Sequence, residues 1–263
     1  MGAHMRLAAI ICVWSDCADL LPSCVDNIAP VVDGVIIMWS KTSNHFIEDD
    51  RIFFTLEQID KKYRTSGKIY FEQAEPKAGL HPRNNETLKR NKGLTWAYGL
   101  GFTHFIMMDS DEYYKQDELL QDKERFKNPD LNGMVHRLKV FVGKPTLCCD
   151  DHTLVPGIHK LSRNTEMGSF KTYPFTYDKQ GNAHIDPTRR VSYTHGIIMS
   201  DFYMWHFSYV RKDIDLKIQN SSANLKNSEA VIKRDIANAK PGYVSELYHR
   251  SLEEVSNYFN IAI

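Results

Sequence analysis

The sequence predicts an α/β protein with a mostly parallel central sheet, helices on its faces and a helical segment at the C-terminal end. In the first part of the chain, short apolar stretches alternate with amphipathic ones four times. Polar residues follow the ends of the apolar stretches, and ligands bind at those ends in parallel sheets. Beyond residue 130 the alternation gives way to several short strand-like stretches and then to helical ones.

The first half contains four predicted strands and three predicted helices. The apolar run from Arg6 to Trp14 predicts a buried strand, and Ser15 or Asp16 can cap the helix after it. Asn84 or Asn85 can cap the third helix. In chain order, strands are expected at 6–14, 31–39, 68–71 and 103–109, and helices at 17–29, 50–65 and 86–101.

The second half predicts shorter strands followed by helices. Gly181-Asn182 indicates a hairpin turn. The expected strands cover 133–142, 158–162, 170–177 and 191–199, and the expected helices cover 211–220, 224–239 and 243–259. We therefore divide the chain into an α/β half (6–115), a mixed strand and loop half of the same domain (116–210) and C-terminal helices (211–263).

Composition excludes some classes of protein. The 263 residues include 33 basic and 33 acidic ones, so the net charge of zero argues against a protein that mainly grips nucleic-acid phosphates. Five cysteines with no metal-finger spacing and no secretory segment indicate reduced thiols in a cytoplasmic protein. No apolar run is long enough to predict a membrane span.

The most informative motif is Asp109-Ser110-Asp111, which directly follows the apolar run Phe105 to Met108. In a strand, residues two apart point the same way, so Asp109 and Asp111 can converge while Ser110 faces away. Converging carboxylates suit a hard divalent cation, Mn²⁺ or Mg²⁺, and such a cation usually accompanies a phosphate. The alternative is a solvated strand end with helix-capping acids.

Two further segments carry groups that suit such a site. His206, in the run MWHFSYVR, can add an imidazole ligand to a manganese site, although a core histidine bonded to a backbone carbonyl is the alternative. Arg211, five residues on, suits a phosphate oxygen. On the helix before the acidic strand, Arg83 and Arg90 can share a face that meets a diphosphate, although charge runs usually form a solvated face.

The opening strand–helix pattern, the segment KRNKGLTWAYGLGFTHFIMMDSDEYY and the later MWHFSYVRKDI resemble nucleotide-sugar glycosyltransferases of the GT-A fold, of the broad family-2-like kind. The resemblance covers residues 6–115 and, locally, 204–220. It implies a GT-A-like (Rossmann-like) sheet and a metal on the donor diphosphate, held by Asp109, Asp111 and His206.

The resemblance also implies donor-binding residues. The base is expected at the loop after the first strand, and a UDP-sugar is the favoured donor. The family commonly has an acidic residue after the second strand, whereas this chain has Trp39-Ser40-Lys41, so Trp39 is a candidate for stacking on the base. Lys217 and Asn220 follow His206 on a helix beside the donor. The expected donor-binding set is Trp14, Ser15, Asp16, Trp39, Arg83, Arg90, Asn91, Ser110, Lys217 and Asn220.

The catalytic machinery is expected to include Arg211, which would add a donor to the leaving diphosphate, and a carboxylate base. Asp186 is the first choice, although Asp186-Pro187 is also a plain turn former. Asp150, Asp151 and Glu166 are further candidates.

The predicted function is metal-dependent transfer of a sugar to an acceptor hydroxyl, which a glycan, a small molecule or a modified nucleic acid could supply. A nucleotidyltransferase would share the metal and the sheet but usually has a glycine-rich first loop, which VWSDCAD lacks. A phosphatase of the aspartyl-nucleophile type would need Thr or Val where Tyr113 stands. A non-catalytic nucleotide-sugar-binding module is the alternative from another class.

Overall fold

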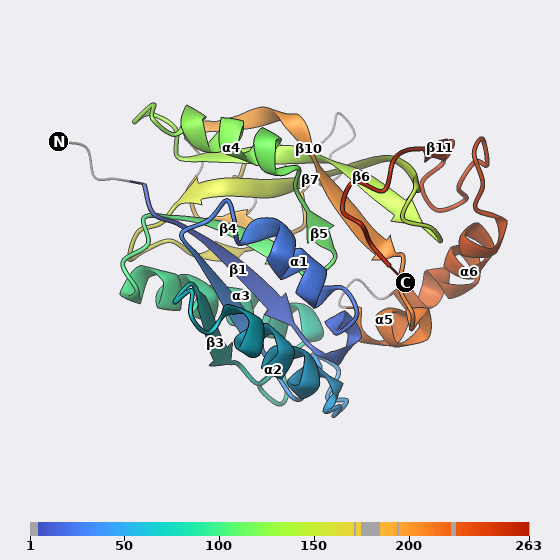
Figure 1. The fold of residues 1–263 in the computed structure, drawn as a ribbon, viewed down its shortest axis with the longest axis horizontal. Coiled ribbons are helices and arrows are strands. Elements are labelled where there is room, and N and C mark those ends of the chain that lie inside the picture. The colour runs from blue at the N-terminus through green and yellow to red at the C-terminus, as the bar shows by residue number, and fades with distance from the viewer. Residues whose placement is uncertain (1–4, 171, 175–184, 194, 222–224, 263) are drawn as a thin grey trace.

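The computed structural model describes residues 5–170, 172–174, 185–193, 195–221 and 225–262, and Figure 1 shows the fold. Within these residues, nine strands form one large curled sheet. Its order is β3 (Ile69–Gln73), β2 (Gly34–Trp39), β1 (Leu7–Val13), β4 (His104–Asp109), β7 (Leu147–Lys160), β6 (Gly133–Val142), β10 (Ile197–Tyr209) and β5 (Glu112–Tyr113), and β11 (Glu253–Glu254) pairs with β7. The small strands β8 (Met167–Gly168) and β9 (Arg190–Val191) pair separately.

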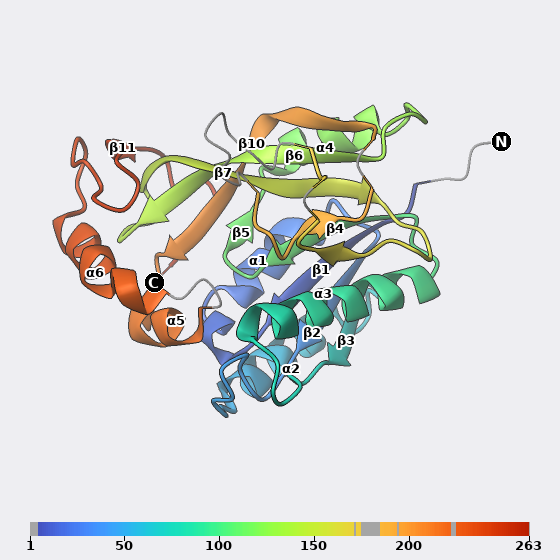
Figure 2. The ribbon, with the colours of Figure 1, turned by 180° about the vertical axis from the view of Figure 1, so that it is seen from behind.

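The first half is the predicted parallel sheet: β1 pairs in parallel with β2 and β4, and β2 with β3. Side chains of β1 alternate between the faces, as strand geometry requires. Leu7, Ala9 and Ile11 pack with α1 (Leu21–Ile28) and α2 (Arg51–Tyr63), while Ala8 and Ile10 pack with α3 (Pro82–Gly99). Helices therefore cover both faces of this half (Figures 1 and 2), and the α/β fold class is confirmed.

Two predicted helix caps were wrong. A 3₁₀ turn over Ser15–Cys17 follows β1 and α1 starts only at Leu21, so the Ser15 hydroxyl instead accepts the amide hydrogen bond of Ile52 in α2, at 3.2 Å. Helix α3 begins at Pro82, and the cap is the His81 side chain, which accepts from the Arg83 amide at 3.3 Å. Proline suits the first helical position because its missing N–H is not needed there.

The second half extends the sheet: β6 has the predicted bounds, β7 begins well before the strand expected at 158–162, and the strand expected at 191–199 is divided between the end of β9 and the start of β10. β7 runs antiparallel to β4 and β6, β6 runs parallel to β10, and β10 runs antiparallel to β5. Asp122 of α4 (Gln116–Arg125) is buried and bonded to His136 at 2.8 Å and Ser200 at 2.7 Å, which fixes this helix to β6 and β10.

One expected strand and one expected turn lie wholly or partly among residues 171 and 175–184, which the structure does not describe. The strand predicted at 170–177 is not formed where it is described, since 172–174 adopt turn and bend conformations. The rest of that strand and the Gly181-Asn182 turn lie outside the described residues.

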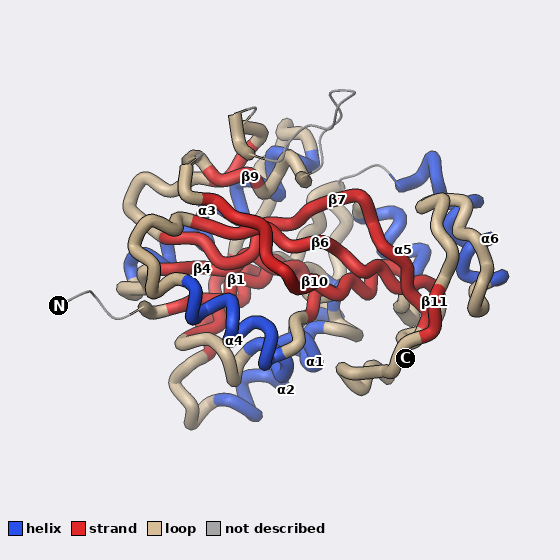
Figure 3. Tube along the Cα trace, turned by 90° about the horizontal axis from the view of Figure 1, so that it is seen from above, coloured by secondary structure: helices blue, strands red, loops and turns tan. Residues whose placement is uncertain are grey.

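The C-terminal helical prediction holds only in part. α5 (Ile214–Asn220), a 3₁₀ turn (Leu225–Ser228) and α6 (Glu229–Asn238) lie beside the ends of β6, β7 and β10 (Figure 3). The helix expected at 243–259 was wrong. There the Asp235 carboxylate accepts the Ser245 hydroxyl at 2.6 Å and the amides of Glu246 and Leu247 at 2.9 and 3.1 Å, so it organises a turn in place of a helix.

The boundaries drawn at residues 115 and 210 stay a prediction, although the sheet runs through both of the first two parts. Among the described residues, the structure contains no helix with the length and apolar character needed to cross a membrane.

Gly93 allows α3 to pack closely on β1, because a Cβ there would lie 2.5 Å from Ile10 Cγ2 and 3.1 Å from Met38 Cγ. We expect Gly93→Ala to lower the free energy of unfolding by about 1–3 kcal/mol through overpacking. Gly99→Ala, on the same helix with nothing within 4 Å of the new Cβ, should raise it by roughly 0.5–1 kcal/mol. Urea unfolding measures both, and a loss no larger for Gly93→Ala than for Gly99→Ala would contradict this packing.

Burial lowers the pKa of His159 to about 4, from an ordinary value near 6.5. Because the unfolded chain binds this proton more readily, stability should fall as the pH drops from about 6.5 toward 4, by up to about 3 kcal/mol for this group. In His159→Gln that part of the pH dependence should disappear, whereas the exposed His249→Gln variant should keep it. Denaturant midpoints between pH 7 and pH 4.5 provide the measurement, and equal slopes in the two variants would rule out this role.

Candidate functional site

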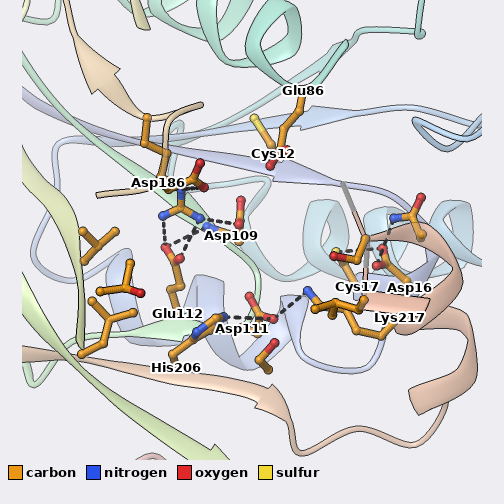
Figure 4. Close-up of a pocket in the computed structure, with 18 of the residues that line it drawn as sticks. Cys12, Asp16, Cys17, Glu86, Asp109, Asp111, Glu112, Asp186, His206 and Lys217 are labelled. Carbon is orange, nitrogen blue, oxygen red and sulfur yellow. Dashed lines mark hydrogen bonds and ion pairs between the residues drawn. The ribbon is translucent and has the colours of Figure 1, made fainter. Parts of the chain in front are cut away.

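A cavity of about 310 Å³ opens at the carboxyl ends of β1 and β4, where the sequence places the site. β7, β10 and α5 complete its walls. Nine of the sequence-predicted residues line it: Trp14, Asp16, Asp109, Asp111, Asp151, Asp186, His206, Lys217 and Asn220. Figure 4 shows Asp16 and Asp186 on opposite sides of the Asp109–Asp111 pair.

Strand pairing brings His206 to the acidic motif. After Asp109 the chain turns into the short strand β5, which pairs antiparallel with β10 so that His206 faces Glu112. The Asp111 carbonyl accepts the Phe207 amide at 2.7 Å, which fixes the two segments to each other. As a result, His206 Nε2 lies 3.5 Å from Asp111 Oδ2.

Asp111 is fully buried and surrounded by cationic groups. Arg211 forms an ion pair with Oδ2, and Lys217 Nζ lies 3.1 Å from the same oxygen. Burial opposes ionisation, but Lys217, Arg211 and His206 outweigh it and hold the pKa of Asp111 well below its usual range. Asp111 is therefore a buried carboxylate that stays ionised.

The imidazole of His206 responds to the same charges. Burial would lower its pKa, but Asp111 and Glu112 outweigh burial and raise the pKa overall. Lys217 on the same wall and Arg211 behind Asp111 give this side of the cavity the positive charge that a phosphate needs.

Asp109 belongs to a second ion cluster, which contains the predicted Arg90 and Asp186 together with Arg189, a residue that sequence reasoning missed. Arg189 forms an ion pair with Asp109 and contacts both oxygens of buried Glu112 at 2.7 and 2.8 Å. Arg90, fully buried, lies 3.3 Å from Asp109 and 2.5 Å from Glu86. Despite burial, Arg189 and Arg90 lower the pKa of Asp109 to about 2, whereas burial raises the pKa of Glu112.

The residues of this cluster come from distant parts of the chain. Glu112 adjoins the acidic motif and was readable as part of it, but Arg189 gives no local signal because it stands next to Arg190 in a stretch that reads as a turn. Its role is visible only in the three-dimensional structure, in which the segment that carries Arg189 lies at the end of β4.

A third group of contacts lies at the opposite side of the cavity. Asn220 Nδ2 donates to Asp16 Oδ2 at 3.1 Å, so the end of α5 meets the loop after β1. Lys89 Nζ donates to the Val13 carbonyl at 3.1 Å and the Ser40 hydroxyl at 2.6 Å, and burial lowers its pKa. Lys89, from the basic segment before the acidic strand, thus places a buried amino group between the ends of β1 and β2.

Several predicted donor-binding residues do not line the cavity. Trp39 packs edge-on against Phe53, with ring centroids 5.3 Å apart, so the structure does not place it for stacking on a base. The Asn91 amide bonds the Met167 backbone at 2.7 and 2.9 Å, and Ser110 is buried. The other donor-binding predictions outside the lining are Ser15, Arg83 and Arg90.

Arg211 lies behind Asp111. Its guanidinium donates to the Asp16 carbonyl at 2.5 Å and the Ser208 carbonyl at 3.3 Å, and it pairs with Asp111. The guanidinium is engaged with these protein groups, and the predicted contact with a phosphate stays a prediction. Arg211 ties the β1 loop to the acidic motif.

Two of the four candidate bases line the cavity, Asp186 and Asp151. Asp150 instead pairs with Lys139 at 3.0 Å, and Glu166 lies outside the lining.

The residues present fit a divalent cation only in part. Among the described side chains, no group of three His, Cys, Asp or Glu residues comes together as metal ligands, and Asp109 is engaged with Arg189 and Arg90. Asp111 Oδ1, however, is buried without a hydrogen-bond partner in the described part of the chain, and His206 is adjacent. Asp111 and His206 thus fit as two donors, and a bound diphosphate could supply further oxygens.

No protein-family model and no curated protein sequence matches the chain. Solved structures of S. aureus TarS are similar to it. A structure of residues 1–349 in complex with UDP-GlcNAc is 21% identical, with a TM-score of 0.37, covering 53% of this chain and 36% of that one. A TarS structure is 14% identical, with a TM-score of 0.45, and the match covers 90% of this chain and 40% of that one. Another structure of TarS residues 1–349 is 16% identical, with a TM-score of 0.44, and the match covers 90% of this chain and 66% of that one.

This chain therefore spans between about a third and two thirds of the length of those structures. At these identities and TM-scores, the likeness does not establish a family for the chain.

The positions of Arg211 and Lys217 predict different effects of neutralising each. Arg211→Gln should lower the free energy of unfolding by about 3–5 kcal/mol, because it breaks a fully buried ion pair with Asp111 and the bonds to the Asp16 and Ser208 carbonyls. Lys217→Gln should cost far less, since this side chain is 18% exposed and lines the cavity. Denaturant unfolding of the two variants provides the comparison, and equal losses would show that Arg211 does not tie the fold together.

Proposed function

We propose that the chain is a glycosyltransferase of the GT-A, family-2-like kind, which transfers a sugar from a nucleotide diphosphate sugar to an acceptor hydroxyl. The observation that carries the proposal is the wall formed by Asp111, His206 and Lys217. It combines a buried ionised carboxylate with cationic groups at the carboxyl edge of a parallel sheet, where such sheets bind phosphorylated ligands.

The donor would lie along this wall. Lys217 would contact the diphosphate, and the base would reach the loop after β1, beside Asp16 and Asn220. We propose a UDP-sugar as the donor. A divalent cation, Mn²⁺ or Mg²⁺, held by Asp111 and His206, would neutralise the charge that develops on the leaving diphosphate.

Asp186, on the other side of the acidic motif, would take the proton of the acceptor hydroxyl. Its side chain is 37% exposed and lines the cavity, so an acceptor could reach it. A base acting from that side would produce inversion at the anomeric carbon. Asp151, on β7, is the second candidate for this role.

The test combines donor binding with turnover. Thermal shifts against UDP-, GDP- and CDP-sugars, with and without Mn²⁺, should show stabilisation that needs one nucleotide and grows with metal. Released nucleoside diphosphate then reports hydrolysis of the donor without a known acceptor. Asp111→Asn should reduce this rate roughly 100-fold or more.

Asp150→Asn serves as the matched control, because Asp150 is exposed and outside the cavity, and it should leave the rate unchanged. Binding without turnover, unaltered by Asp111→Asn, would favour a non-catalytic binding module. No binding of any nucleotide sugar would overturn the proposal.

A further inference from the structure

The turn that carries Asp186 is fastened at both ends. Ile185 forms a bridge with Leu154 of β7, and Arg190 pairs with Gly168 in the small sheet of β8 and β9. Between these anchors the Arg189 amide donates to the Asp186 carbonyl at 3.0 Å, which closes a tight turn. This turn brings Asp186 and Arg189 to the end of β4.

Arg189 links the turn to the acidic motif. Its side chain is only 4% exposed, and its guanidinium contacts Glu112 through two nitrogens while also pairing with Asp109. Its Nε lies 3.7 Å from Asp186 Oδ2. A planar guanidinium can pair with Glu112 and Asp109 while its Nε faces Asp186, whereas an ammonium group acts as a point charge.

Arg90 supports the turn from the opposite side. It donates to the Thr188 hydroxyl and lies 3.8 Å from Asp186 Oδ2. Thr188 in turn donates its amide and hydroxyl to Asp186 Oδ1, at 2.7 and 2.8 Å. One oxygen of Asp186 is thus fixed by hydrogen bonds, while the other faces two guanidinium groups at distances too long for hydrogen bonds.

We propose that Arg189 is a positioning residue, which fixes the reactive Oδ2 of Asp186 relative to Asp109 and Glu112 at the end of β4. The inference rests on the proposed function, in which Asp186 takes the proton of the acceptor. In this arrangement the orientation of the base depends on the buried guanidinium of Arg189, with Arg90 supporting the same turn through Thr188. Since an error of about 1 Å in the placement of a reacting group can reduce a rate roughly 100-fold, the link governs turnover.

The experiment compares Arg189→Lys with wild type, using the UDP-sugar that stabilises the wild-type protein. Lysine keeps the charge but cannot bridge Asp109, Glu112 and Asp186 together. We expect kcat for donor hydrolysis to fall roughly 100-fold, while the Kd for the donor, measured by titration, changes by less than about threefold. Arg163→Lys, at an exposed position, is the matched control and should change neither quantity.

A double-mutant cycle separates positioning from a general structural role. If Arg189 acts through Asp186, adding Arg189→Lys to Asp186→Asn should reduce kcat little further. Fully additive losses, an unchanged kcat in Arg189→Lys, or a loss confined to donor affinity would each overturn the inference. If wild type binds no nucleotide sugar, the proposed function itself fails, which is a separate result.

A second variant covers the case in which Arg189→Lys does not fold. Thr188→Val removes the hydroxyl that connects Arg90 to Asp186 and keeps the shape of the side chain. It should also lower kcat while leaving donor Kd unchanged, and wild-type turnover in a folded Thr188→Val protein would contradict the proposed fixing of Asp186.

Discussion

Burial of the carboxylates at the end of β4 is the constraint on which the rest of the site depends. Asp111 and Glu112 are almost completely removed from solvent, and an unpaired carboxylate in such a place would be very costly. Cationic side chains from α3, the turn at 185–190, β10, α5 and the segment between them converge on this point. The sheet places these acidic side chains at its carboxyl edge. Because their buried negative charge must be neutralised, the basic side chains of distant segments lie next to them.

The two ion clusters around the motif differ in ways that bear on function. The cluster around Asp111 brings Arg211, Lys217 and His206 to one carboxylate, whereas the cluster around Asp109 brings two arginines to Asp109, Glu112, Glu86 and Asp186. Positive charge therefore prevails beside Asp111 and negative charge beside Asp109. This difference across adjacent residues is consistent with an anion on one side and a proton acceptor on the other.

Local sequence patterns predicted the parallel half of the sheet and the position of the acidic motif. Strands that are buried on both faces consist of apolar residues, and the loops that follow them are polar, so both kinds of segment can be recognised in the sequence. His206 was predicted to reach that motif, but the reason, antiparallel pairing of β5 with β10, joins residues almost a hundred positions apart. Arg189 was missed for the same reason. The helix expected at 243–259 failed because Asp235, one buried carboxylate, captures the amides that a helix would have used.

Gly93 and Arg90 lie three residues apart on α3, almost one helical turn. The glycine allows the helix to lie close to β1, and the arginine on the same rigid element reaches Asp109 and Thr188. The separation of helix and sheet therefore also determines how far the guanidinium extends over the carboxylates. Larger side chains between α3 and β1 would move the Arg90 guanidinium relative to the carboxylates, even if they contact none of the residues that line the cavity. Core packing along this helix and the electrostatics of the site therefore depend on each other.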